Sequence, residues 1–331
     1  MTTATSHPPT APLSSAWSAL PPEYAIPDHA PSEAEARKYC RRLARSHYEN
    51  FSVASWFLPE RLRQHFFNVY AYCRISDDLG DEAGDTAASL QLLDQWETEL
   101  DACYEGTSGH ARHPVFVALA ETVRKFEIPK HEFADLLTAF RQDQSISRYP
   151  TFSDLLGYCR YSANPVGHLV LYLCGYRDAE RQSLSDYTCT ALQLANFWQD
   201  VSADFARGRI YLPLEDLRRF GVSEDVIRDD ENSTAFRAMM EFEVERAREW
   251  FAQGLPLVAK VERALATDIE LFSRGGQEIL HAIERQDYAV LGRRPAISKT
   301  RKLALVARAA VGKLRRNPRQ KAWENELEKE R

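Results

Sequence analysis

The sequence predicts an all-α protein, and the spacing of its apolar residues and its turn composition support this prediction. Apolar side chains recur at spacings of three and four in residues 83–104, 114–127, 131–143, 184–206 and 235–266. The Gly-rich hairpin turns that an all-β chain would need do not separate these stretches. Hydrophobic residues make up 44% of the 331 residues, enough for a packed interior, and the length alone fits one domain or two.

Residues 1–33 are expected to form a disordered, Pro-rich arm, because seven of the sixteen prolines and none of the fourteen glycines lie in the first 31 residues. A Ser-x-x-Glu pattern at Ser32 and Glu35 then predicts the start of the first helix. No basic stretch followed by an apolar one opens the chain, so we expect no secretory signal and a cytoplasmic location.

The chain is expected to be soluble or peripheral to a membrane, since no apolar run approaches the roughly eighteen residues that span a bilayer. Its six cysteines are widely spaced and form no C-x-x-C pair, which argues against a zinc site or a disulfide framework. We interpret them as small buried side chains.

Residues 291–331 form a basic amphipathic C-terminal segment. Eleven Lys or Arg and no Asp or Glu lie between Gly292 and Trp323, although the whole chain has a formal charge of -6. Two interpretations stay open: a solvated helix that caps the domain, or peripheral contact with an anionic membrane surface. Nucleic-acid binding is not expected, because the rest of the chain is acidic and carries no nucleic-acid motif.

A first acidic stripe lies in residues 68–82. Tyr70, Arg74, Asp77 and Asp81 follow one another at spacings of four, three and four, so they share one helix face. Arg74 can neutralise Asp78, but the remaining carboxylates lie one turn apart and repel each other. The excess negative charge on this face favours binding of a cation.

A second stripe carries Gln193, Asn196, Asp200 and Asp204 at spacings of three, four and four. One such stripe is more often a solvated helix surface, whereas two in one chain, each with amides or an arginine, are stronger evidence for a site. Hard oxygen ligands without His or Cys suit Mg²⁺ completed by phosphate oxygens, and argue against zinc.

Two opposed carboxylate helices with Mg²⁺ between them would clamp a diphosphate and make it a good leaving group. The carbocation that remains must be kept from water in an apolar central cavity and stabilised by aromatic faces. Tyr158 and Val166 are candidates for the wall of this cavity, with plain core packing as the alternative for each.

Three segments resemble the squalene/phytoene synthase family over residues 35–290. "VYAYCRISDDLGDE" and "QLANFWQDVSADFARGRIYLP" are similar to the two aspartate motifs of that family, and "YCRYSANPVG" is similar to the helix between them. The resemblance implies a single-domain isoprenoid synthase helical bundle over residues 34–290, prenyl diphosphate substrates and Mg²⁺ as cofactor.

The resemblance also implies roles for individual residues. The expected metal ligands are Asp77, Asp81, Asn196, Asp200 and Asp204. The four aspartates and Tyr158 are the expected catalytic residues. The expected substrate-binding residues are Tyr48, Asn50, Tyr70, Arg74, Val166, Gln193, Gln199, Arg209 and Tyr211.

The chain departs from the family pattern at informative positions. Gln199 stands where the family usually has Arg, and Tyr48 and Asn50 replace serines of a diphosphate-binding turn. Residues 163–165 replace Ala-Gly-x, so we expect a kink and additional polar groups such as Asn164 near the cavity. A site for two diphosphates should keep its cations and hydroxyls, so these changes suggest a substrate with one diphosphate.

This pattern resembles the hydroxysqualene synthases of bacterial hopanoid biosynthesis, which also read "HYENF" and "NFWQDV". The resemblance implies conversion of presqualene diphosphate and water to hydroxysqualene and diphosphate, with other squalene-pathway enzymes as partners. One alternative is a condensing synthase that makes presqualene diphosphate, squalene or phytoene from two prenyl diphosphates. Another is a non-catalytic helical assembly factor, which would be free to lose its aspartates.

Overall fold

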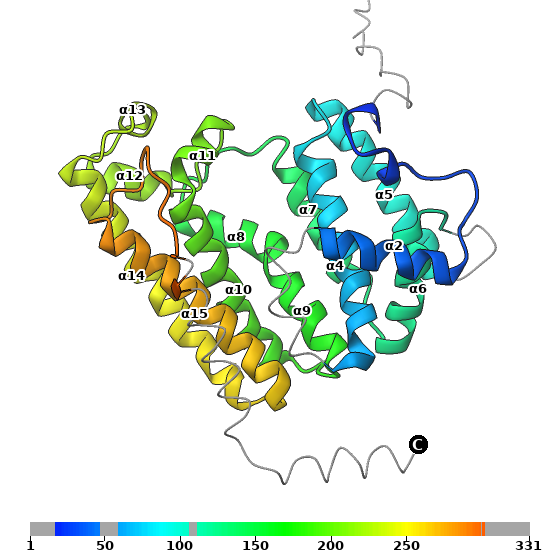
Figure 1. Cartoon of the computed structure of the whole chain (residues 1–331). Coiled ribbons are helices and arrows are strands. Elements are labelled where there is room, and N and C mark those ends of the chain that lie inside the picture. Colours follow the sequence, from blue (N-terminus) through cyan, green and yellow to red (C-terminus); the bar gives the residue numbers. More distant parts are fainter. Residues whose placement is uncertain (1–16, 47–58, 106–110, 299, 302–331) are drawn as a thin grey trace, which may run out of the picture.

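The chain folds into an all-α assembly of helices (Figure 1). The computed structural model describes residues 17–46, 59–105, 111–298 and 300–301, and this part contains no β-strand beyond an isolated bridge. Its α-helices are α2 (Glu33–Ser46), α4 (Glu60–Asp81), α5 (Thr86–Glu105), α6 (Pro114–Phe126), α7 (His131–Gln142), α8 (Phe152–Ser162), α9 (Asn164–Leu173), α10 (Ala179–Gln199), α11 (Val201–Ala206), α12 (Leu214–Phe220), α13 (Glu224–Arg228), α14 (Thr234–Gly254) and α15 (Arg263–Arg285). Its 3₁₀-helices are η1 (Trp17–Ala19), η2 (Pro22–Tyr24) and η3 (Leu255–Ala259).

Two large hydrophobic clusters form the interior. The first lies between α2, α4, α5, α6 and α7 and contains the fully buried Trp96 and Phe116. The second lies between α8, α10, α12, α14 and α15 and contains Trp198 and Phe236. Helix α9 packs against α4 and α7 on one side and α10 on the other, so it joins the two halves (Figure 1).

The predicted kink is present at the junction of α8 and α9. Ala163 ends α8 with φ −121° and ψ −47°, and Pro165 lies in the first turn of α9, where its missing N–H is tolerated. The Asn164 side chain is buried and accepts a hydrogen bond from Thr190 Oγ1 at 3.0 Å. Asn164 therefore stabilises the packing of α9 on α10.

The N-terminal segment differs from the expected disordered arm at residues 17–33, while residues 1–16 lie outside the described part. Leu20 and Tyr24 are buried, and the Tyr39 hydroxyl on α2 donates to the Glu23 carbonyl at 2.8 Å. Its prolines therefore shape two 3₁₀ turns around apolar anchors. The predicted capping box is confirmed, since Ser32 and Glu35 bond each other's backbone N–H.

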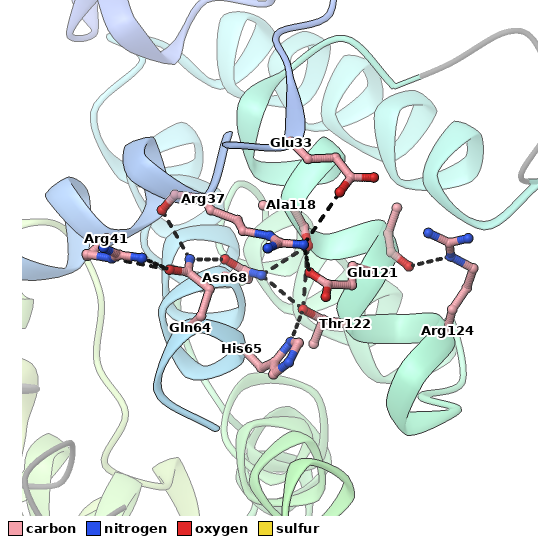
Figure 2. A network of polar contacts seen from close by, with 11 residues as sticks. Glu33, Arg37, Arg41, Gln64, His65, Asn68, Ala118, Glu121, Thr122 and Arg124 are labelled. Carbon is pink, nitrogen blue, oxygen red and sulfur yellow. Dashed lines mark hydrogen bonds and ion pairs between the residues drawn. The ribbon is translucent and has the colours of Figure 1, made fainter. Parts of the chain in front are cut away.

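A polar network joins α4 to α6 and to a carbonyl of α2 (Figure 2). Asn68 is fully buried and donates to the Ala118 carbonyl and to Thr122 Oγ1, both at 3.0 Å. Gln64 donates to Asn68 Oδ1 at 2.8 Å, and His65 Nδ1 lies 3.0 Å from Thr122 Oγ1. Satisfied buried amides of this kind fix the register of helix packing, so the network holds the start of α4 in place.

The C-terminal boundary also differs from the prediction of a domain ending at residue 290. Val290 and Leu291 are both buried in the second hydrophobic cluster, so residues 286–298, the C-terminal strap, belong to the folded domain. Most of the predicted basic segment lies outside the described residues. Within the described ranges, none of the helices combines the length and apolar character that crossing a membrane requires.

Candidate functional site

The two predicted acidic stripes converge at one end of the bundle. Asp77 and Asp81 lie in the last turns of α4, and Asp200 and Asp204 lie at and just after the end of α10. We call these four residues the aspartate site. Arg209, which follows α11, bonds Asp81 Oδ1 at 3.0 Å, and its charge also acts on Asp204.

Carboxylate crowding is visible in the pKa values of the aspartate site. Burial and the neighbouring Asp81 charge raise the pKa of Asp77 to about 6. Burial and the Asp200 charge raise the pKa of Asp204 to about 7, and Asp81 across the gap contributes to this rise. The stripes are therefore close enough for their charges to interact, as a shared cation site requires.

Arg74 is bound within its own helix. Its Nε donates to Asp78 Oδ2 at 3.0 Å, a second nitrogen contacts Oδ1, and Asp77 lies 3.7 Å away. The Tyr24 hydroxyl also donates to Asp78 Oδ2, at 2.8 Å. Asp78 thus holds Arg74 beside the aspartate site, whereas Tyr70 is half-buried on the same face of α4.

The expected single helix over residues 184–206 is interrupted at Asp200, which has φ −108° and ψ 15°. The Asp204 N–H still bonds the Asp200 carbonyl at 2.9 Å, so both carboxylates stay on one side of the chain. Asn196 lies exposed one turn before Asp200, and Gln193 is partly buried one turn earlier.

Gln199 is not placed as predicted. Its side chain is buried and donates to the Pro295 carbonyl of the C-terminal strap at 2.5 Å. Arg294 from the same strap bonds Gln199 Oε1 at 3.1 Å and Asp200 Oδ2 at 3.0 Å. Arg294 therefore supplies the positive charge that Gln199 lacks. The expected loss of positive charge beside the diphosphate does not follow from having Gln at position 199.

The donor set fits Mg²⁺ without forming a complete cage. Among the described residues, no three His, Cys, Asp or Glu side chains lie close enough together to bind a metal by themselves. Two facts explain this: like charges repel, and Arg209 and Arg294 neutralise Asp81 and Asp200. Mg²⁺ needs only one or two carboxylates beside waters and phosphate oxygens, so the aspartate site can supply its protein ligands.

An aspartate outside both stripes lies beside them. Asp143 follows α7 and accepts a hydrogen bond from the Tyr158 hydroxyl at 2.9 Å, with the Tyr211 hydroxyl at 3.5 Å. The rings of Phe197 and Tyr211 stack with centroids 3.9 Å apart. These residues and Tyr149 are called the Asp143 cluster.

Arg209 connects the Asp143 cluster to the aspartate site. Burial raises the pKa of Asp143 to about 6, while the Arg209 charge opposes this rise and the charges of Asp81 and Asp77 add to it. Asp143 was not predicted from the sequence. A signal existed, because Asp143 falls seven residues after Leu136 and four after Ala139, on the buried face of α7.

The remaining predicted residues fall into three groups. Tyr158 and Tyr211 are buried in the Asp143 cluster, and Val166 on α9 is 41% exposed. Tyr48 and Asn50 lie outside the described residues.

A cavity of about 320 Å³ lies at the opposite end of α4 from the aspartate site. It is lined by Arg61, Leu62, Lys125, Phe126, Leu173 and Leu265, among others.

Comparison with known proteins agrees with this architecture. Residues 44–301 match the squalene/phytoene synthase family model. The 15-cis-phytoene synthase of Synechocystis sp. (strain ATCC 27184 / PCC 6803 / Kazusa) is 30% identical over 284 residues, which cover 82% of this chain and 83% of the relative. The crystal structure of squalene synthase HpnC from Alicyclobacillus acidocaldarius is 45% identical with a TM-score of 0.73, covering 82% of this chain and 98% of that one. The crystal structure of a dehydrosqualene synthase in complex with ligand is 28% identical with a TM-score of 0.76, and the match covers 84% of this chain and 96% of that one.

Proposed function

The chain belongs to the squalene/phytoene synthase family, and on this premise we propose that it converts presqualene diphosphate and water to hydroxysqualene and diphosphate. The observation that carries the proposal is the 45% identity to squalene synthase HpnC over 82% of the chain. The "HYENF" and "NFWQDV" segments, which resemble hydroxysqualene synthases, support the same choice.

The aspartate site supports ionisation of a diphosphate ester. Asp77 and Asp81 on one helix and Asp200 and Asp204 on the other would hold Mg²⁺, with Asn196 as a further oxygen donor. When bound, Mg²⁺ neutralises the diphosphate and makes it a better leaving group. Arg209 lies between Asp81 and the Asp143 cluster, where its charge can stabilise the departing anion.

The second candidate is condensation of two prenyl diphosphates, because several curated relatives of this chain are phytoene synthases. Phytoene synthase of Arthrospira platensis is 28% identical over 285 residues. Arg294 also favours this candidate, because it restores a cation beside Gln199 that two diphosphates would use.

Incubation of the purified chain with Mg²⁺ and one diphosphate at a time, without NADPH, separates the two candidates. We expect hydroxysqualene from presqualene diphosphate and no turnover of farnesyl or geranylgeranyl diphosphate. Consumption of farnesyl or geranylgeranyl diphosphate alone would favour condensation. Contact with a membrane surface and with other squalene-pathway enzymes stays a prediction, which vesicle flotation and co-purification would test.

A further inference from the structure

The Asp143 cluster contains a hydroxyl group whose role the aspartate site does not explain. Tyr149 is 3% exposed, and its hydroxyl has no hydrogen-bond partner among the residues that the structure describes. Buried hydroxyls are nearly always bonded, because an unpaired one loses its interaction with water without compensation. The orphaned hydroxyl therefore indicates a small polar ligand at this position.

The surroundings of the Tyr149 hydroxyl are polar and lie beside the aspartate site. The Tyr149 ring centroid lies 5.5 Å from that of Tyr158 and 5.7 Å from that of Tyr211. Burial, followed by the charges of Tyr211 and Asp143, raises the pKa of Tyr149. The hydroxyls of Tyr158 and Tyr211 therefore contact one carboxylate, that of Asp143, and the Tyr149 ring lies beside both of their rings. Arg209 couples this carboxylate to Asp81.

The hydrogen-bond pattern leaves acceptors for a water molecule. The Tyr158 hydroxyl donates a hydrogen bond to Asp143 Oδ2, so its oxygen can accept a hydrogen bond from another group. The Tyr149 oxygen can accept as well. A water that donates one hydrogen to each oxygen keeps a lone pair free for an electron-deficient carbon.

We infer that the Asp143 cluster holds the water that captures the carbocation, an inference that rests on the proposed hydroxysqualene synthase activity. The water oxygen forms a C–O bond with the cationic carbon while one of its O–H bonds breaks. The released proton passes to the Tyr158 hydroxyl, whose own proton passes to Asp143. The products are a neutral alcohol and a protonated Asp143. Tyr158 and Tyr149 contact the water, and Asp143 acts through Tyr158 as a positioning residue.

Single-turnover reactions of presqualene diphosphate with Mg²⁺ test this assignment in Tyr149→Phe, Tyr158→Phe and Asp143→Asn. Without a held water, the carbocation loses a proton and forms an alkene. We expect the alcohol share of the product to fall about tenfold or more in each variant. Asp143→Glu should recover part of the share that Asp143→Asn loses, since it keeps a carboxylate for Tyr158.

Tyr149→Phe separates function from folding. It removes a buried hydroxyl that bonds none of the described residues and, by this inference, only the held water, so its Tm should stay close to that of the unmodified protein. Tyr187→Phe is the matched control, because Tyr187 packs on Trp250 with centroids 5.1 Å apart and lies outside the Asp143 cluster. It should give the unmodified product ratio.

The outcomes distinguish this inference from the proposed function. An unchanged alcohol share in Tyr149→Phe and Tyr158→Phe, with a normal alcohol yield from the unmodified protein, overturns the inference alone. If the unmodified protein forms no alcohol from presqualene diphosphate, the proposed function fails and the inference fails with it.

Discussion

Asp77 and Asp200 differ in how the fold treats their charge, and this difference makes them informative targets. Burial and the neighbouring Asp81 charge raise the pKa of Asp77 to about 6, whereas Asp200 is paired with Arg294. We expect Asp77→Asn and Asp200→Asn each to lower kcat by at least about 100-fold, because each removes a proposed Mg²⁺ ligand. Steady-state assays with presqualene diphosphate, combined with circular dichroism, measure activity and folding together.

Stability should respond in the opposite sense to activity at Asp77. An acid whose pKa is raised by folding destabilises the native state when it is ionised, so Asp77→Asn should keep or slightly raise Tm at neutral pH. Asp94→Asn is the matched control, because Asp94 is 71% exposed and pairs with Arg141 on the outside of the bundle. Near-normal kcat in both active-site variants would rule out the metal roles assigned above.

The four aspartates could be predicted because helical periodicity alone places them on two faces. The residues from other parts of the chain that lie beside these aspartates could not be predicted. Arg294 lies 95 residues from Gln199 in the sequence, and its position depends on how the C-terminal strap crosses the end of α10. Asp143 was missed because a single acid that continues an apolar helix face is a weak signal, and its role depends on Tyr158 and Tyr211, which pack against it in the fold.

Helices α7, α9 and α10 are tied together by one charged histidine. His168 Nδ1 lies 3.0 Å from Glu132 Oε2, and Nε2 lies 2.7 Å from Asp186 Oδ1. Burial alone would lower the pKa of His168, but the hydrogen bonds to Asp186 and Glu132 outweigh it and raise the pKa to about 9. The imidazolium is therefore part of the native structure at neutral pH.

The contacts of His168 with Glu132 and Asp186, here called the His168 brace, predict a pH dependence of stability. Because folding raises the pKa of His168 from 6.5 to about 9, its stabilising contribution is complete below about pH 6.5 and disappears as pH rises through 9. Over that interval the free energy of unfolding should fall by about 3 kcal/mol more in the native protein than in His168→Gln. Urea unfolding at several pH values measures this difference, and parallel pH curves for the two proteins would refute the brace.

Two adjacent glycines of α15 predict opposite effects. A Cβ at Gly276 would lie 2.4 Å from the Phe251 ring and 2.8 Å from Leu192, whereas a Cβ at Gly275 would meet nothing within 4 Å. We expect Gly276→Ala to destabilise the fold by about 1–3 kcal/mol through overpacking against α10 and α14. Gly275→Ala should be neutral or stabilise by up to about 1 kcal/mol through helix propensity. Equal effects in urea unfolding would show that α15 packs differently.

Helix boundaries show what periodicity can and cannot reveal. The break before Pro165 was predictable because proline acts locally on its own backbone. The interruption at Asp200 was not, since no proline or turn motif marks it and the apolar spacing continues through it. The end of α14 at Gly254 carried a signal that the expected helical stretch over residues 235–266 overlooked, because Pro256 follows two residues later. At Gly254 a Cβ would lie 2.3 Å from Thr188 Oγ1, so α10 approaches α14 too closely there for a larger side chain.

The molecule consists of two packed halves, and negatively charged aspartates of one half lie near those of the other. The first half contributes Asp77 and Asp81 and the second contributes Asp200 and Asp204, while Arg209 joins them with a bond to Asp81. An all-α chain of this kind could be predicted from sequence. The facing of its two acidic ends was expected from the metal chemistry of the two stripes and from the family resemblance. Periodicity alone could not place them together, because their facing depends on how α9 packs between the halves.

Mg²⁺ together with pyrophosphate should stabilise this arrangement as a unit. A ligand set that bridges both halves binds only the folded protein, and at about 100-fold above its Kd it should raise Tm by roughly 5 °C. Neither component alone completes the bridge, so each should give a much smaller shift. Asp204→Asn removes a ligand from the second half and should abolish most of the joint effect, while Asp94→Asn should retain it. Thermal unfolding followed by circular dichroism measures these shifts. The same shift in Asp204→Asn as in the unmodified protein would mean that the ions bind elsewhere and that the two acidic ends do not share them.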